Sequence, residues 1–145
     1  MDMPAPREAP REAPREACVE VRSDADVIAA RQKGREIADQ LGFSATELTM
    51  IVTAISELAR NIVRYAGHGE VRLKIERNHA SSGLVVIASD EGPGILDVQK
   101  ALQDGFSTSG GLGLGLPGVK RLMDDFQIES SVDKGTVITT KKWRR

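Results

Sequence analysis

Hydrophobic and polar residues follow two different periods along this chain. In two long stretches of the first half, apolar side chains recur every three to four residues, as they do on the buried face of a helix. The first stretch ends at Gly42, a residue type suited to the left-handed position after a helix. The second begins with a capping box formed by Ser44 and Glu47 and extends to about Tyr65. The pattern therefore predicts two consecutive helices.

Five shorter runs alternate between apolar and polar residues, or are apolar throughout, as strands are. They are residues 18–23, 70–76, 84–90, 126–132 and 136–143. The run 84–90 is typical of a central strand and delivers Asp90 at its end. Pro117 is typical of a helix start, and a short helical piece is expected at 96–102. This order of elements predicts an α+β fold, a two-layer α/β sandwich with a mixed, mostly antiparallel sheet and helices on one face.

The first 17 residues have a different composition from the rest. They contain Pro-Arg-Glu-Ala three times in register and almost no bulky apolar side chain. Such a segment cannot bury enough surface to offset the entropy lost on ordering. We therefore expect a disordered tail at residues 1–17 and one domain at 18–145.

Composition and charge indicate which classes of binding partner the chain is not expected to have. The 145 residues are 40% hydrophobic, enough for one core, and 20 Lys and Arg balance 21 Asp and Glu to a net charge of −1. There is no overall basic field to attract nucleic acid or an anionic membrane. Cys18, the single cysteine, cannot form an internal disulfide. These features predict a soluble cytoplasmic protein with neither nucleic acid nor a membrane as partner.

A glycine-rich segment from Gly110 to Gly115 leads into the helix expected at Pro117. It lacks the order Gly-x4-Gly-Lys-Ser/Thr of the P-loop. It also lacks the preceding strand that the glycine loop of a dinucleotide-binding fold requires. A run of backbone N–H groups at a helix N-terminus nevertheless favours an anion, so phosphate contact is preferred to a flexible linker. Lys120 could reach the same anion or be a solvated surface lysine.

Two further motifs carry candidate chemistry. Glu57 and Asn61 share one side of the second helix, where a carboxylate can accept a proton and an amide oxygen suits Mg²⁺. Taken alone, this spacing is also typical of a solvated polar face. Asp90 precedes Gly92 and Gly94 at the end of a strand, where the carboxylate could accept from an exocyclic amine; a plain Gly-Pro turn is the alternative.

Taken together, four motifs occur in a fixed order. They are Glu57-x3-Asn61 on a helix, Asp90-x-Gly92-x-Gly94 after a strand, the glycine-rich segment entering a helix, and a late Gly135-Thr136. In this order and spacing they resemble the Bergerat-fold ATP-binding family, which includes DNA gyrase and the histidine kinases. The resemblance covers roughly residues 18–143. Within the family, stretches 55–62 and 104–124 are most similar to the small anti-sigma-factor serine/threonine kinases, especially the switch kinases of the bacterial stressosome.

The resemblance implies a role for each motif. Glu57 would be the catalytic base, Asn61 would coordinate Mg²⁺ between the ATP phosphates, and Asp90 would bind the adenine amine. Thr136 would assist adenine binding, and residues 97–109 would form a short lid. The remaining ATP-binding positions are Gly92 and Gly94 in the base pocket, Gly110, Gly111, Gly113 and Gly115 along the triphosphate, and Lys120.

The function implied is that of a protein serine/threonine kinase. It would use Mg²⁺ and ATP to phosphorylate a STAS-domain antagonist protein and a related STAS scaffold protein, and once released it would activate a PP2C-type phosphatase in a partner-switching stress or sigma-factor pathway. Two other functions stay open. One is a binding module in which nucleotide only stabilises the fold, and the other is a simple ATPase in which Glu57 activates water.

Overall fold

The computed structural model describes residues 15–95, 102 and 115–145. Within these residues the chain forms a sheet covered by helices, and the predicted α+β sandwich is confirmed. The elements, in chain order, are β1 (Glu16–Val21), α1 (Asp24–Gln40), α2 (Ala45–Asn61), the π-helix η1 (Ile62–Ala66), β2 (Gly69–Arg77), β3 (Ser82–Asp90), α4 (Gly115–Leu122), β4 (Asp125–Ser131) and β5 (Gly135–Trp143).

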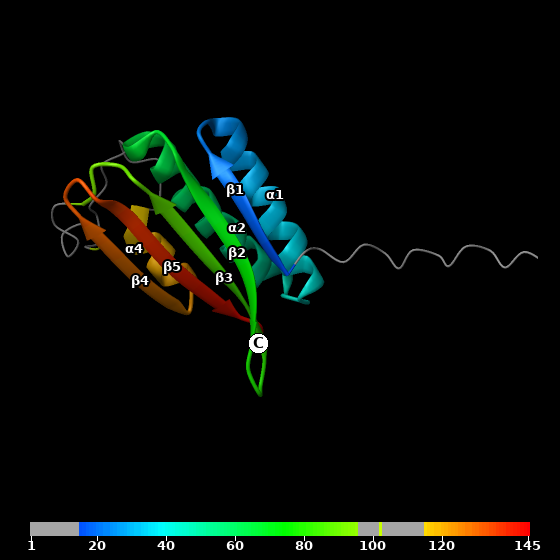
Figure 1. Cartoon of the computed structure of the whole chain (residues 1–145). Helices are drawn as coiled ribbons and strands as arrows, with labels where there is room; N and C mark the ends of the chain where they lie inside the picture. The colour runs from blue at the N-terminus through cyan, green and yellow to red at the C-terminus, as the bar shows by residue number, and fades with distance from the viewer. Residues whose placement is uncertain (1–14, 96–101, 103–114) are drawn as a thin grey trace, which may run out of the picture.

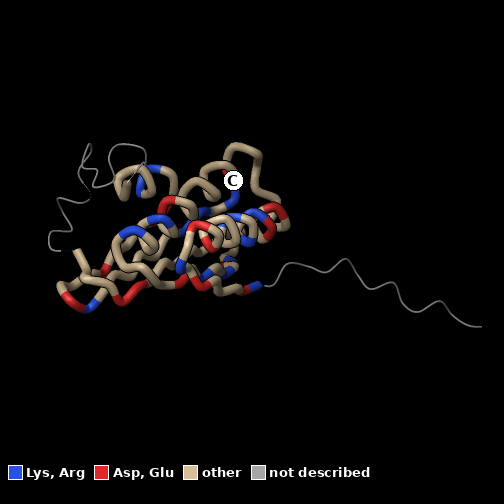
Figure 2. The backbone as a smooth tube through the Cα atoms, turned by 90° about the horizontal axis from the view of Figure 1, so that it is seen from above, with Lys and Arg blue, Asp and Glu red and all other residues tan. Residues whose placement is uncertain are grey.

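The sheet has the strand order β1-β2-β3-β5-β4, with α1, α2 and α4 on one of its faces (Figure 1). Seen from above, the helices form one layer and the strands the other (Figure 2). Every pairing among the described strands is antiparallel, so the mixed sheet expected from the sequence is wrong in that detail. As predicted, β3 is the central strand.

The core lies between the sheet and the helices. Alternate residues of the strands point into it, as the period of two requires, and Val71, Leu73 and Val86 are fully buried there. The helices contribute Ile37, Ile51 and other apolar residues of the two stripes read from the sequence.

Local capping explains where the helices begin and end. Ser44 Oγ accepts the Glu47 N–H at 3.1 Å and the Glu47 carboxylate accepts the Ser44 N–H at 3.1 Å, which confirms the capping box. Gly42 has a φ of 82°, as expected after a helix. The helices α1 and α2 pack closely at Gly34, since a side chain there would overlap Ile55.

Strand ends differ from the sequence prediction by up to two residues, and three boundaries bear on the tail or on the candidate site. Strand β1 begins at Glu16, so the last two residues assigned to the tail belong to the sheet, where Ala17 packs on the core. The α-helix expected to reach Tyr65 ends at Asn61 and continues as the π-helix η1. Helix α4 begins at Gly115, two residues before Pro117. The helical piece expected at 96–102 lies outside the described residues, apart from Leu102.

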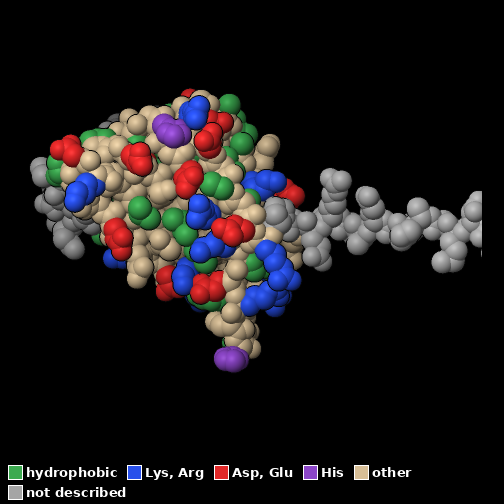
Figure 3. Space-filling model, viewed as in Figure 1, with side chains coloured by type: hydrophobic (Ala, Val, Ile, Leu, Met, Phe, Trp, Pro, Cys, Tyr) green, Lys and Arg blue, Asp and Glu red, His purple; other side chains and the backbone are tan. Residues whose placement is uncertain are grey.

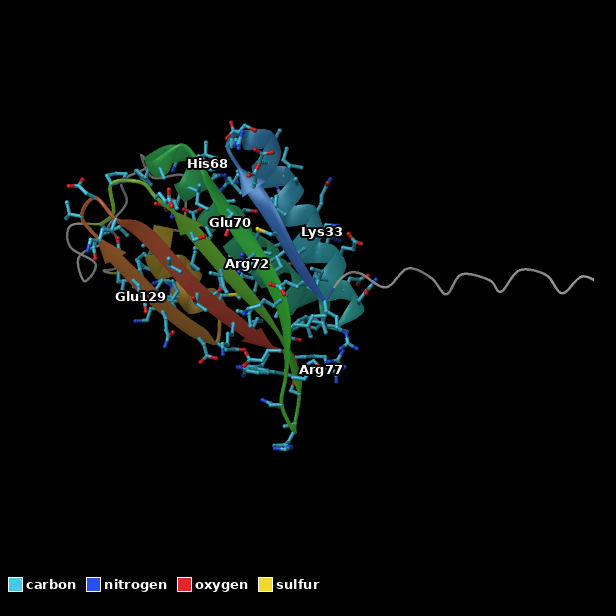
Figure 4. The ribbon with its side chains drawn as sticks, viewed as in Figure 1. Lys33, His68, Glu70, Arg72, Arg77 and Glu129 are labelled. Atoms are coloured by element: carbon cyan, nitrogen blue, oxygen red, sulfur yellow. The ribbon has the colours of Figure 1, made fainter. Side chains whose placement is uncertain are left out.

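The other face of the sheet carries no helix in the described part of the chain. Acidic and basic side chains are intermixed across it (Figure 3). On β2, Glu70 and Arg72 form a 3.6 Å ion pair, and the exposed Cys18 thiol of β1 donates to Glu70 at 3.3 Å (Figure 4). Burial, together with the hydrogen bond and charge of Glu70, raises the pKa of Cys18, which Arg72 partly offsets.

No helix among the described residues is both long and apolar enough to span a bilayer.

Candidate active site

The sheet register places two predicted site residues opposite each other. Asp90 is the last residue of β3 and Thr136 the second of β5, and they are direct partners across the β3–β5 pair. Both lie on the helix-covered side, where Thr136 is buried and Asp90 is half-buried. Asp90 Oδ1 accepts the Gly92 N–H at 2.9 Å, which fixes the carboxylate at the turn that follows the strand. Two motifs far apart in the sequence therefore meet at one sheet position.

Close backbone approaches explain the glycines around Asp90. A side chain at Gly92 would come within 2.6 Å of Ala66 Cβ, in the π-helix. Gly94 has a φ of 77° and lies against the Ser131 carbonyl, and Gly135 has a φ of 86° and lies against the Asp90 carbonyl. No larger residue fits these positions without moving its neighbours. The glycines thus shape the loop after β3.

Ser130 of β4 joins this loop to Thr136, and the sequence reasoning missed it. Its Oγ accepts the Ile95 N–H at 2.7 Å, donates to the Gly135 carbonyl at 3.1 Å and lies 2.8 Å from Thr136 Oγ1. A signal was present in the sequence, because Phe126, Ile128 and Ser130 alternate on the inward face of the strand. A hydroxyl at an inward position is at least partly removed from water and needs partners within the protein.

Glu57 occupies a buried position on α2. The residue is 3% exposed, and its Oε1 accepts the Gly115 N–H at 3.1 Å while Oε2 lies 3.5 Å from Arg60 Nη1. Both carboxylate oxygens thus face donors. The solvated polar face that the helix pattern allowed is wrong for Glu57, because α4 packs over it. Arg60 is exposed beside it.

The glycine-rich segment is described only at its end. Gly115, with a φ of 64°, is the first residue of α4, and its N–H is the group that binds Glu57. The expected phosphate-binding Gly110, Gly111 and Gly113, and the lid at 97–109 except Leu102, lie outside the described residues. Lys120 is an exposed residue of α4.

Asn61 is the last residue of α2 and is half-buried one turn beyond Glu57. The π-helix begins directly after it, and π-turns are frequent at functional sites. Among the residues that the structure describes, no three His, Cys, Asp or Glu cluster as a metal site. The amide oxygen of Asn61 is a hard ligand that fits Mg²⁺, an ion usually shared between few protein oxygens, water and phosphates.

The comparisons with known proteins agree with this geometry. The family model of the histidine kinase-like ATPase domain matches residues 21–142, so the chain belongs to that family. The serine/threonine-protein kinase RsbT of Bacillus subtilis strain 168 is 52% identical to it over 128 residues, which cover 88% of this chain and 96% of RsbT. The anti-sigma F factor of Clostridium kluyveri is 32% identical over 117 residues, which cover 78% of this chain and 82% of that protein.

A solved structure, the mycobacterial sensor histidine kinase MprB, shares the fold. It matches with a TM-score of 0.52 and 16% identity over 90% of this chain and 98% of that chain.

The family model and the two relatives confirm the expected family, its anti-sigma-factor branch and the serine/threonine-kinase class of enzyme, and with them the use of ATP.

Proposed function

We propose that this kinase transfers the γ-phosphoryl group of Mg-ATP to a serine or threonine hydroxyl, with Glu57 as the catalytic base. The observation that carries the proposal is the position of Glu57, buried on α2 and bound to the first N–H of α4. The glycine-rich segment enters the same helix, so a phosphate on that segment would lie near the carboxylate. A catalytic base must lie within hydrogen-bond reach of the proton that it takes, and the position of Glu57 next to the glycine-rich segment supports that role.

Each side chain then has one task in the reaction. Asp90 and Thr136 bind the adenine. Glu57 takes the proton of the acceptor hydroxyl while the hydroxyl oxygen bonds to the γ-phosphorus and ADP leaves. Asn61 would hold Mg²⁺, which when bound neutralises charge between the phosphates. Gly110, Gly111 and Gly113 would contact the phosphates through backbone N–H groups, with Lys120 as a further contact. Gly115, whose N–H binds Glu57, would bring the segment into α4 beside them.

The proposed acceptors are a STAS-domain antagonist protein and a STAS scaffold protein, and the proposed downstream partner is a PP2C-type phosphatase in the cytoplasm. Support comes from the similarity to RsbT and to anti-sigma F factors, whose names place those relatives among kinases and sigma-factor regulators. Phosphorylation of the acceptor would weaken its binding and release the kinase to the phosphatase. The exchange of partners would then be the signal.

A phosphotransfer assay tests this function. The chain is incubated with Mg-ATP labelled on the γ-phosphate and a purified STAS protein, and labelled acceptor is measured. Glu57→Gln should lower the rate by about 100-fold or more, since general-base catalysis contributes about 10²- to 10⁴-fold. Glu129→Gln is the matched control, because this exposed carboxylate lies on the opposite sheet face (Figure 4).

The alternatives give different results in the same assay. Nucleotide and acceptor binding without label transfer would identify a binding module, and free phosphate without acceptor would identify a simple ATPase. Equal transfer rates for Glu57→Gln and the unaltered chain would remove Glu57 from the role of base.

A further inference from the structure

The hydroxyl of Ser130 contacts three polar groups at once. These are the Ile95 N–H at 2.7 Å, the Gly135 carbonyl at 3.1 Å and Thr136 Oγ1 at 2.8 Å. A serine hydroxyl has one proton to donate and two lone pairs that accept. The three contacts therefore use its whole hydrogen-bonding capacity.

Counting protons gives the direction of the hydroxyl–hydroxyl bond. The Gly135 carbonyl can only accept and the Ile95 N–H can only donate, so the Ser130 proton goes to Gly135. Thr136 must then donate its own proton to Ser130. With that proton engaged, Thr136 Oγ1 offers only lone pairs to any further group.

The role of Thr136 Oγ1 as a hydrogen-bond acceptor matters because its neighbour on β3 is also an acceptor. Asp90 stands directly opposite in the β3–β5 register, and an ionised carboxylate also only accepts. Residues directly opposite each other on one sheet face have Cβ atoms about 4.5–5.5 Å apart, so the register brings two acceptors to one place. Such a pair matches an exocyclic amine, which carries two N–H groups. A 6-oxo purine places a carbonyl oxygen where adenine has its amine, and that oxygen would face acceptors only.

We infer that Ser130 is a specificity-determining residue that orients the Thr136 hydroxyl as an acceptor and so favours 6-amino over 6-oxo purine nucleotides. The inference rests on the proposed nucleotide site. Ser130 acts through Thr136 and is a positioning residue. Without Ser130, the Thr136 hydroxyl is able to rotate and donate to a 6-oxo group.

The test compares ATP with inosine triphosphate (ITP) by calorimetry with magnesium. Ser130→Ala should lower the preference for ATP, measured as Kd for ITP divided by Kd for ATP, by about 3- to 10-fold, the effect of one hydrogen bond. The ratio is the informative quantity, because losing the Ile95 contact weakens both nucleotides alike. Ser130→Thr keeps a hydroxyl and should restore the preference, and Ser131→Ala, an exposed neighbour, should leave it unchanged.

A second variant covers the case in which Ser130→Ala does not fold. Thr136→Val should lower the preference similarly, and adding Ser130→Ala to it should change the ratio no further. An ATP preference unchanged within twofold in Ser130→Ala, or in Thr136→Val if the former is unfolded, overturns the inference while leaving the ATP site intact. Failure of the unaltered chain to bind ATP overturns the proposed function itself, and this inference with it.

Discussion

At the scale of single residues, the contact between Gly92 and Ala66 joins the Asp90 side of the candidate site to the Asn61 side. Gly92 follows Asp90, and Ala66 ends the π-helix that begins after Asn61. A Cβ on Gly92 would lie 2.6 Å from Ala66 Cβ and 3.1 Å from Asp90 Oδ1. Both distances are shorter than van der Waals contact, so the space beside Asp90 depends on the absence of a side chain at this position.

Replacing Gly92 tests this dependence. Gly92→Ala should push the loop away from Ala66 and displace the Asp90 carboxylate, weakening ATP binding by about 10-fold or more, as misplacing one strong hydrogen bond does. Calorimetry with Mg-ATP measures the change. The double variant Ala66→Gly with Gly92→Ala removes one of the two overlapping methyl groups and should recover part of the affinity. Full affinity in Gly92→Ala alone would show that the loop tolerates the extra carbon.

The sequence predicted the residue types of this site but not their surroundings. Asp90 and Thr136 stand at strand ends that the alternation of apolar residues located. The burial of Glu57 could not be read from the helix pattern, because α4, which covers it, comes from a distant part of the chain. Ser130 was missed because the alternation along β4 indicates only that it points inward, whereas its partners depend on the strand register, which no local pattern specifies.

At the scale of elements, α4 is attached at both ends. Its first residue donates to Glu57, and its last carbonyl, that of Leu122, accepts from Lys142 Nζ at 2.8 Å. Lys142 is 7% exposed, lies 3.8 Å from Asp124 Oδ1 and also reaches Met50 Sδ at 3.5 Å. A cation at the C-terminal end of a helix also interacts favourably with the helix dipole. Lys142 therefore connects β5, α2 and α4.

Two adjacent lysines allow a controlled test of this connection. Lys142→Ala should lower the free energy of unfolding by about 1 to 3 kcal/mol, because it leaves the Leu122 carbonyl without its side-chain donor. Asp124 keeps the Trp143 N–H and Arg145 as partners. Lys141→Ala removes a surface ion pair with Glu76 and should cost less than about 1 kcal/mol. Urea unfolding followed by circular dichroism measures both. Equal losses would contradict a special role for Lys142.

The sequence predicted the end of an element correctly where the contacts that fix that end are local. The capping box at Ser44 located the start of α2 because both of its hydrogen bonds lie within four residues. The π-turn after Asn61 was not predicted, since its apolar spacing resembles that of an α-helix. The contact of the α4 N-terminal end with Glu57 was not predicted either, because it joins residues 58 positions apart in the sequence.

At the scale of the whole molecule, the fold brings elements that are far apart in the sequence to the same face of the sheet. Helices α2 and α4 cover one face of the sheet (Figure 1), the face on which Asp90 and Thr136 lie, and α2 carries Glu57 and Asn61. The π-helix contacts β2 and β3 and joins the Asn61 side to the Asp90 side. Rigid elements therefore hold the described site residues, which favours a preformed nucleotide site.

A preformed site predicts that nucleotide stabilises the whole chain. Mg-ATP at 100 times its Kd should add about 2.7 kcal/mol to the free energy of unfolding, and a rise of several degrees in Tm should follow. If Asn61 holds Mg²⁺, chelating the metal with EDTA should lower this rise, and Asn61→Ala with magnesium should show the same reduced rise. Thermal unfolding with ATP, with and without EDTA, measures it, with Gln127→Ala on the open sheet face as control. A full magnesium-dependent rise in Asn61→Ala would assign the metal to other groups and leave Asn61 without that role.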